Sequence, residues 1–231
     1  MRIDISALER SVEGELNAFV YASLSNRREI MAEAENRRAL GQSPEQAIRG
    51  LQALTEGGRK PAPVHLWNPP YCGELDMRIA RDGTWYYQDS PIGRAPLVKL
   101  FASVLRKDPE RYVLVTPVER LGLTVEDAPF LGVEMRAEGE GDGATIALRT
   151  NVDDWVVVDV EHPLRFERGE AEGLKPYVRV RGDLWALVKR ALFYDLVALG
   201  ETAPHEGREW FGVRSRGLFF PMAPAAEIEG L

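Results

Sequence analysis

Hydrophobic and polar residues follow two different periods along the chain, and the change between them falls near residue 60. Before that point, apolar residues from Leu8 to Leu24 recur at helical spacing and form one stripe. A second helix is predicted from the capping pair Ser43-Pro44 to the glycines at 57 and 58. The pattern predicts a helical extension and linker over residues 1–60, which docks on the main body or on a second chain, or serves as an oligomerisation or partner-binding arm.

From residue 61 the pattern changes to the alternation of half-buried strands, interrupted by single helices. In a first α+β domain, residues 61–137, strands at 75–81 and 85–87 are joined at Asp82-Gly83, a strong hairpin signal. A turn at 90–93 leads to a helix that Pro96 opens and Asp108-Pro109 ends. Strands are predicted at 112–115, 123–125 and 130–135.

A second α+β domain is predicted over residues 138–231. The glycines between 139 and 143 form a hairpin connection, followed by strands at 145–150, 155–160, 164–167 and 177–181. A helix from Leu184 to about Leu199 is expected, with Asp183 as N-cap and Gly200 as its end. Hairpin, Gly turn, apolar helix and strand follow one another in both domains, which indicates an internal duplication of about 90 residues.

Composition and charge narrow the class of protein. The 231 residues carry a net charge of -7, which argues against a general nucleic-acid binder because such a protein needs a basic face. A single cysteine, Cys72, excludes an internal disulfide and a cysteine-based zinc site. No long apolar run opens the chain, so no signal peptide or membrane span is expected and a cytoplasmic location is predicted.

The chain contains no standard catalytic or cofactor motif. Cys72 as a nucleophile would need a base, for which His65 and His162 are candidates, but a buried structural role is expected instead. Glu119 and Asp127 form a candidate acid–base pair whose separation the sequence does not fix. No metal site is predicted, because the remaining acidic residues lack calcium-loop spacing: Asp76, Asp153, Asp154, Asp159 and Glu161.

Arginines and aromatic residues give a more specific hypothesis. Arg grips phosphate or carboxylate groups through two hydrogen bonds, and aromatic faces stack on flat rings. Both domains supply such residues: Arg78, Arg94, Arg165, Arg179, Arg190, Trp67, Tyr87 and Tyr177. A groove between the two halves lined by them would suit an anionic, aromatic ligand.

The run from His65 to the C-terminus resembles an uncharacterised bacterial family, domain of unknown function 1285. The resemblance is carried by the segments at 67–70, 72–73, 76–79, 82–85, 90–92, 116–119, 127–130, 151–152, 162–165, 176–178 and 217–220. It implies a duplicated α+β architecture, a C-terminal half with a pleckstrin-homology-like fold, and a site for a nucleotide-like ligand at the junction of the halves. It also implies a role in signal transduction, and no activity is established for the family. The N-terminal helices fall outside the family pattern.

We therefore expect a ligand-binding or regulatory protein rather than an enzyme, with its cofactors unknown. The expected ligand-binding residues are Trp67, Asp76, Arg78, Arg94, Asp127, Phe130, Arg165, Tyr177 and Arg179. One alternative is a hydrolase or transferase that uses Glu119, Asp127 or Cys72 in the same groove. The other is a protein-interaction scaffold, or a homo-oligomer, that makes its contacts through residues 1–58.

Overall fold

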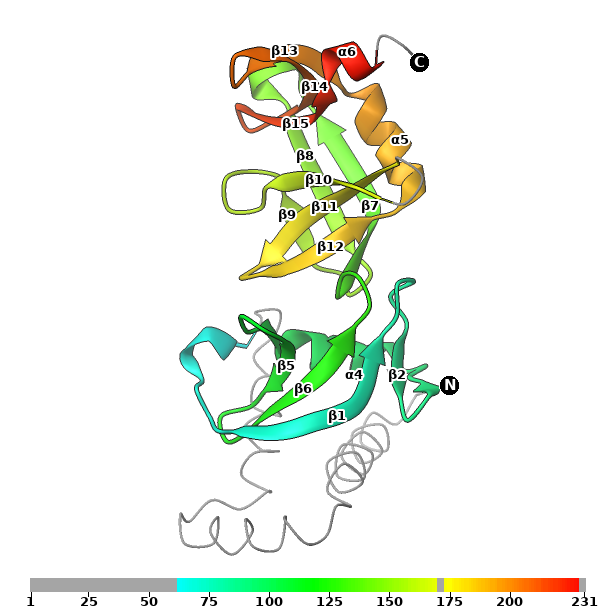
Figure 1. The fold of residues 1–231 in the computed structure, drawn as a ribbon, viewed down its shortest axis with the longest axis vertical. Helices are drawn as coiled ribbons and strands as arrows, with labels where there is room; N and C mark the ends of the chain where they lie inside the picture. The colour runs from blue at the N-terminus through cyan, green and yellow to red at the C-terminus, as the bar shows by residue number, and fades with distance from the viewer. Residues whose placement is uncertain (1–61, 170–172, 229–231) are drawn as a thin grey trace, which may run out of the picture. The chain divides into compact units, whose positions relative to one another are not determined.

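The computed structural model describes residues 62–169 and 173–228 (Figure 1). The predicted helical extension and most of its linker therefore lie outside the described residues. The described chain divides into two compact units. The first unit comprises residues 62–77 and 87–123, and the second comprises residues 78–86 and everything from residue 124 onward.

The first six-stranded sheet has the order β3-β2-β1-β6-β5-β4. Its strands and the helices beside them are η1 (Val64–Leu66), β1 (Tyr71–Ile79), β2 (Trp85–Tyr87), β3 (Ser90–Pro91), α4 (Ala95–Ser103), β4 (Leu105–Lys107), β5 (Tyr112–Val115) and β6 (Arg120–Val125). The predicted hairpin at Asp82-Gly83 is confirmed, and Gly83 has φ +80° there. Gly83 is also sterically required, because a Cβ at this residue would lie 2.9 Å from Leu131 Cδ1.

Helix α4 is shorter than predicted. Pro96 lies in its first turn as expected, and Phe101 and Ala102 form its buried side. The helix ends at Ser103 rather than at Asp108, and the residues between them form β4, which pairs antiparallel with β5. Leu105 is fully buried in this strand pair. Burial of Leu105 in the sheet therefore overrides the helical spacing that the apolar residues share.

The second unit contains a six-stranded sheet of order β10-β11-β12-β7-β8-β9 and a three-stranded sheet of order β13-β14-β15. Its elements are β7 (Phe130–Glu138), η2 (Gly141–Gly143), β8 (Thr145–Thr150), β9 (Trp155–Val157), β10 (Leu164–Arg168), β11 (Leu174–Arg181), β12 (Leu184–Val188), α5 (Arg190–Ala198), β13 (Glu201–His205), β14 (Arg208–Ser215), β15 (Leu218–Pro224) and α6 (Ala225–Ile228). The predicted turn at 139–143 is confirmed, and β14 and β15 form a closing hairpin around Gly217. β12 pairs with β7 in parallel, and every other pairing described in these two sheets is antiparallel.

The predicted helix from Leu184 to Leu199 is wrong in its first half. Residues Leu184–Val188 form strand β12, with alternate residues buried, and the helix begins only at Arg190. Gly182 adopts φ +49° and turns the chain between β11 and β12, so Asp183 belongs to a hairpin and is not an N-cap. Helical spacing fits the apolar residues of this segment, Leu184, Leu187, Val188 and Ala191. The turn at Gly182 nevertheless places the first three in a strand that pairs with β11.

One order of elements occurs twice in the chain. Three consecutive strands, one helix and three further consecutive strands make up β1-β2-β3-α4-β4-β5-β6, and again β10-β11-β12-α5-β13-β14-β15. In the first copy the outer strands β1 and β6 are hydrogen-bonded neighbours, and in the second copy β10 and β15 contact each other. The architecture is therefore α+β with two similar halves, as the sequence predicted. β7, β8 and β9 are additional strands of the second half.

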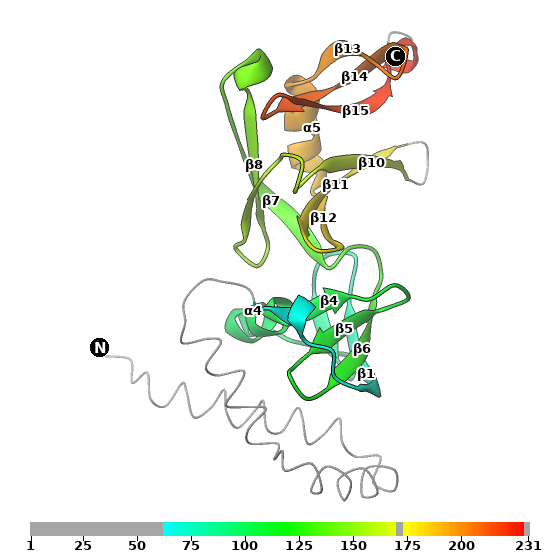
Figure 2. The same cartoon turned by 90° about the vertical axis from the view of Figure 1, so that its left-hand side faces the viewer.

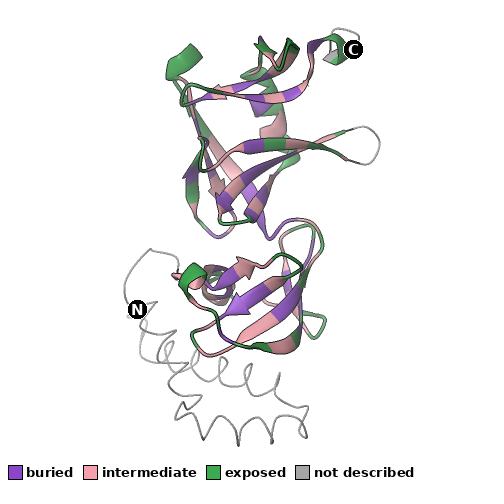
Figure 3. Ribbon diagram, turned by 60° about the vertical axis from the view of Figure 1, so that its left-hand side comes forward, coloured by how far each residue is buried: buried purple, intermediate pink, exposed green. Residues whose placement is uncertain are grey.

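The residues on one face of each sheet in the second unit are buried. Figure 2 shows how the strands of these sheets are arranged, and Figure 3 colours the buried residues purple. Val178, Ala186 and Val188 lie on that face of β11 and β12. Ser215 is a buried polar residue that links the two sheets: its hydroxyl accepts a hydrogen bond from Ile146 N (3.0 Å) and donates one to Val158 O (2.6 Å). Both backbone groups would otherwise be buried without this partner.

Candidate functional site

The opposite face of β10, β11 and β12 carries charged and aromatic side chains. Arg165 on β10 lies directly across from Tyr177 on β11, and Arg179 lies across from Trp185 on β12. Because side chains alternate along a strand, the residues two positions away share the same face. We call the set Arg165, Glu167, Lys175, Tyr177 and Trp185 the Arg165 face.

The guanidinium group of Arg165 lies over two aromatic rings. Its central carbon is 4.0 Å from the centroid of Trp185 and 5.1 Å from the centroid of Tyr177. Its Nε is 3.1 Å from Glu167, in a pair whose side chains are 46% and 49% exposed. An exposed pair of this kind is weak, at about 0–1 kcal/mol. Arg165 is thus fixed by the rings while its N–H groups remain accessible to an anion.

Asp127 holds two side chains of this face, Lys175 and Tyr177, in place. Its carboxylate accepts hydrogen bonds from Lys175 Nζ (2.8 Å) and Tyr177 Oη (2.6 Å), and its side chain is only 12% exposed. Burial alone would raise the pKa of Asp127, but the bonds from Lys175 and Tyr177 outweigh burial and lower it. The pKa of Tyr177 is raised, by burial and by the bond to Asp127. Tyr177 is therefore a neutral donor and Asp127 a carboxylate at neutral pH.

The neighbouring carboxylate, Glu126, binds the tip of the β1–β2 hairpin. Arg78 Nη1 donates to Glu126 at 2.8 Å, and the backbone N–H of Arg81 donates to the same carboxylate at 3.2 Å. The Arg78 guanidinium also stacks on Tyr86, at 4.2 Å from its centroid. Arg81 contributes to lowering the pKa of Asp127 through its positive charge. Two basic residues of the hairpin are therefore held by the segment that contains Asp127.

The structure brings together three of the predicted ligand-binding residues, Asp127, Arg165 and Tyr177. Arg179 is on the same face, but its Nε donates to Gly182 O in the adjacent turn. Phe130 is fully buried beneath Arg181 and presents no surface. Arg78 belongs to the second unit, where it is paired with Glu126. The remaining members, Trp67, Asp76 and Arg94, belong to the first unit, so no common site with the Arg165 face is described.

The groups of the enzymatic alternative are divided between the two units, with Asp127 in the second. Cys72 Sγ is 3.5 Å from Pro70 O, and the Glu119 backbone closes a turn with Thr116; both lie in the first unit. Asp153 and Asp154 pair with Arg149 and Arg181. No cluster of three His, Cys, Asp or Glu side chains suited to a metal ion occurs among the described residues.

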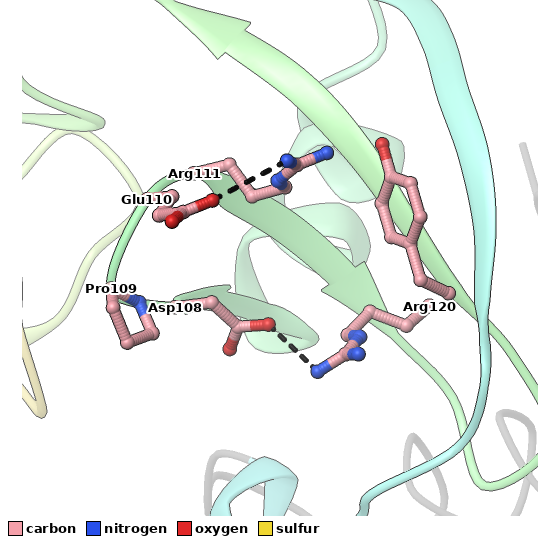
Figure 4. A pocket seen from close by; sticks show the side chains of 6 residues that line it. Asp108, Pro109, Glu110, Arg111 and Arg120 are labelled. Atoms are coloured by element: carbon pink, nitrogen blue, oxygen red, sulfur yellow. Dashed lines mark hydrogen bonds and ion pairs between the residues drawn. The ribbon is translucent and has the colours of Figure 1, made fainter.

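A shallow hollow of about 440 Å³ lies in the first unit, at the turn between β4 and β5 (Figure 4). It is lined by Tyr71, Asp108, Pro109, Glu110, Arg111 and Arg120. Its charged groups pair with each other or with neighbours: Arg120 binds Asp108 at 3.0 Å, and Arg111 binds Glu74 at 3.1 Å while stacking on Tyr71 at 4.7 Å. The lining is close to electrically neutral, and its size falls in the range of ligand pockets.

Several residues of the Arg165 face and of the hollow in the first unit were absent from the predicted ligand-binding residues. Trp185 was assigned to the predicted helix, so its place opposite Arg179 was not foreseen. Lys175 had no signal of its own, although its spacing of two from Tyr177 would have placed it on the same face of a longer β11. The lining of the hollow was missed because Asp108-Pro109 was interpreted as a helix end.

Comparison with known proteins identifies the family. Residues 62–128 match the model described as "Domain of unknown function (DUF1285), N-terminal domain", and residues 129–222 match "Protein of unknown function (DUF1285), C-terminal domain". The chain belongs to the DUF1285 family. No curated protein matches it. In the described residues of this DUF1285 protein, no helix is long and apolar enough to cross a membrane.

Two solved structures of DUF1285 family proteins are similar to the chain. The protein from Silicibacter pomeroyi DSS-3 shares 45% sequence identity, with a TM-score of 0.69, and the match covers 78% of this chain and 98% of that one. The protein from Shewanella baltica OS155 shares 27% identity, with a TM-score of 0.43 and coverage of 54% and 91%. The two family-model matches and the similarity to the Silicibacter pomeroyi protein confirm the family resemblance expected from the sequence.

Proposed function

We propose that this DUF1285 protein binds a small anionic ligand with an aromatic ring, such as a nucleotide, at the Arg165 face. The observation that carries the proposal is the Arg165 guanidinium lying over Tyr177 and Trp185 with its N–H groups accessible. A phosphate can replace the exposed Glu167 as the partner of Arg165, because a planar guanidinium forms two parallel hydrogen bonds with phosphate oxygens.

The Lys175 ammonium supports the proposal with a second positive charge on the same face. It is 40% exposed and is held in place by Asp127. The half-exposed edge of Trp185 offers an aromatic surface for a ligand ring. Asp127 and Tyr177 are positioning residues in this proposal, because their polar groups are already bonded to each other.

The proposal includes the finer expectations from the sequence: a cytoplasmic protein with a regulatory role in signal transduction, and a pleckstrin-homology-like fold for the C-terminal half. The family resemblance supports these expectations. Binding without turnover is favoured because the carboxylate of Asp127 is already bonded to Lys175 and Tyr177.

A thermal-shift panel of nucleotides, sugar phosphates and inorganic phosphate tests the proposal on the full chain. A ligand present at 100 times its dissociation constant raises the free energy of unfolding by about 2.7 kcal/mol, which is readily detected. Calorimetric titration then compares wild type with Arg165→Glu, which should lose binding, and with Arg168→Glu. Arg168 is the matched control because it lies on the same strand but on the opposite face, paired with Glu227.

Charge reversal at Arg78 gives a second comparison, since Arg78 is held by Glu126 at the tip of the hairpin. Loss of affinity in Arg165→Glu alone places the ligand on the Arg165 face, and loss in both variants extends the site to the hairpin. Equal affinity in wild type and Arg165→Glu for every ligand found would refute the placement. A reaction product that appears when the protein is incubated with the ligand would show that the protein is an enzyme and not only a ligand-binding protein.

A further inference from the structure

The hydrogen-bond register of β9 determines which backbone groups of this edge strand point outward. β8 and β9 pair antiparallel, with Leu148 opposite Val156 and Arg149 opposite Trp155. The bonds at the two ends of the pair, from Val158 N to Ile146 O and from Thr150 N to Asp154 O, identify the hydrogen-bonded positions. In an antiparallel ladder such positions alternate, so Val156 bonds to β8 while Trp155 and Val157 do not. The N–H and C=O groups of Trp155 and Val157 therefore point away from the sheet.

The other sheet edges within residues 62–169 and 173–228 are protected. β3 ends in Pro91 and β13 contains Pro204, and proline prevents strand addition because it has no N–H. β4 is contacted by η1, whose Val64 carbonyl is bound by Arg106. β10 and β15 contact each other. In the part of the chain that the structure describes, β9 contains no proline and is the outermost strand of its sheet, with β8 on one side and no hydrogen-bonded strand on the other.

The side chains at this edge are apolar and exposed. Trp155 is 40% exposed and Val157 is 38% exposed, while Val156 between them is buried. Arg136 stacks on Trp155 at 4.3 Å and supports the indole ring. Apolar side chains at alternate positions of an added strand would contact Trp155 and Val157 on this face, as cross-strand neighbours do.

Carboxylates lie at both ends of β9. Asp153 and Asp154 precede the strand, and Asp159 and Glu161 follow it. Asp153 and Asp154 each form an ion pair with one arginine but remain 52% and 42% exposed, and such exposed pairs are weak enough for another cation to compete. Antiparallel pairing of two copies of β9 about Val156 would place Asp153 of one copy opposite Asp159 of the other. Like charges in opposite positions destabilise a sheet, so these residues disfavour self-pairing. They favour a partner strand with basic residues on both sides of its apolar centre.

We propose that β9 is a docking edge for an extended peptide segment of another protein, with apolar side chains at alternate positions and lysine or arginine at both ends. The segment adds to the sheet as a new strand. It forms hydrogen bonds with the outward groups of Trp155 and Val157, while its ends face the acidic residues. This site is separate in sequence from the Arg165 face and does not depend on the ligand proposed there.

Amide hydrogen exchange of the isotope-labelled full chain gives the first test. In the free protein the Trp155 and Val157 amides should exchange quickly and the Val156 amide slowly. The probe is a synthetic peptide with two valines separated by a threonine and two lysines at each end. Adding it should slow Trp155 and Val157 selectively. Slow exchange at these two amides in the free chain would overturn the proposal, because another segment or a second copy would already cover the edge.

Paired variants separate backbone pairing from side-chain contact. Val157→Pro removes the outward N–H without affecting a bond to β8, and should weaken peptide binding by about tenfold or more. Val157→Thr keeps the N–H and should bind nearly as wild type. If Val157→Pro does not fold, the same hydrogen bond is removed from the peptide by N-methylation of its central residue. Unchanged affinity after either modification contradicts strand addition.

A peptide with glutamates in place of the lysines tests the charge argument. It should bind about tenfold more weakly than the lysine peptide at low salt, and the difference should shrink as salt is raised. Equal affinities of the two peptides would contradict the proposed basic ends of the segment, because the flanking charges would then not contribute to binding. A mass that doubles with concentration, together with protected Trp155 and Val157 amides, would show that the occupant is a second copy.

Discussion

Replacing Asp127 tests whether this carboxylate holds the Arg165 face together. Asp127→Ala leaves the buried Tyr177 hydroxyl without its acceptor, which costs about 1–3 kcal/mol. It also removes the bond to Lys175, whose 40% exposure limits that contribution to about 0–1 kcal/mol. The expected loss in the free energy of unfolding at pH 7 is therefore about 1–4 kcal/mol. Asp127→Asn keeps an acceptor for Tyr177, so it should lose less than about 1 kcal/mol.

The loss should depend on pH in one direction. The pKa of Asp127 is lowered from its usual value of 3.8, so its charged form is favoured in the folded protein. Its contribution is present above pH 3.8 and is lost as the pH falls through the lowered pKa. Urea unfolding followed by circular dichroism at pH 7, 5 and 3 measures the difference between wild type and Asp127→Ala. A difference within about 0.5 kcal/mol at pH 7, or one that does not shrink in acid, would refute the reasoning.

Three further predictions concern single contacts. Ser215→Ala should lower the free energy of unfolding by about 2–4 kcal/mol in urea titration, since its buried hydroxyl bonds two backbone groups. Tyr177→Phe should flatten the alkaline part of the stability profile: the raised pKa of Tyr177 stabilises the fold below pH 10, and this is lost as pH rises further. Gly200→Ala should cost about 1–3 kcal/mol, because the added Cβ would approach the Phe211 ring to 2.1 Å, and its thermal midpoint reports this.

Most strands of the fold could be predicted because their signals are local. The alternation of apolar and polar residues, together with the Asp82-Gly83 pair, was sufficient to locate the first hairpin. The strand Thr145–Thr150 was predicted with the bounds observed. The helix predicted from Leu184 to Leu199 was wrong in its first half, because the apolar residues there fit a helix and a strand equally well. What separates the two is the positive φ at Gly182 and the pairing of Leu187 with Leu131, a contact between distant parts of the chain.

The candidate site was predicted in part, because residue type alone indicates which side chains could bind a ligand. Arg165, Tyr177 and Asp127 were selected by residue type, and the structure places them together. Sequence could not tell that Asp127 is occupied by Lys175 and Tyr177, because these bonds join residues about fifty positions apart. Nor could it show that Phe130 is buried, since an aromatic residue after a proline is compatible with either a pocket or a core.

The segment that joins the two family domains has a consequence for dissecting the gene. The matched domains meet between residues 128 and 129, yet Glu126 binds Arg78 and Asp127 binds Lys175, all within the second unit. A fragment cut at this boundary would lose Asp127 and the hairpin tip that places Gly83 beside Leu131. The two halves are therefore expected to have been inherited as an inseparable pair, because each unit consists of two segments of the chain and no single cut separates them.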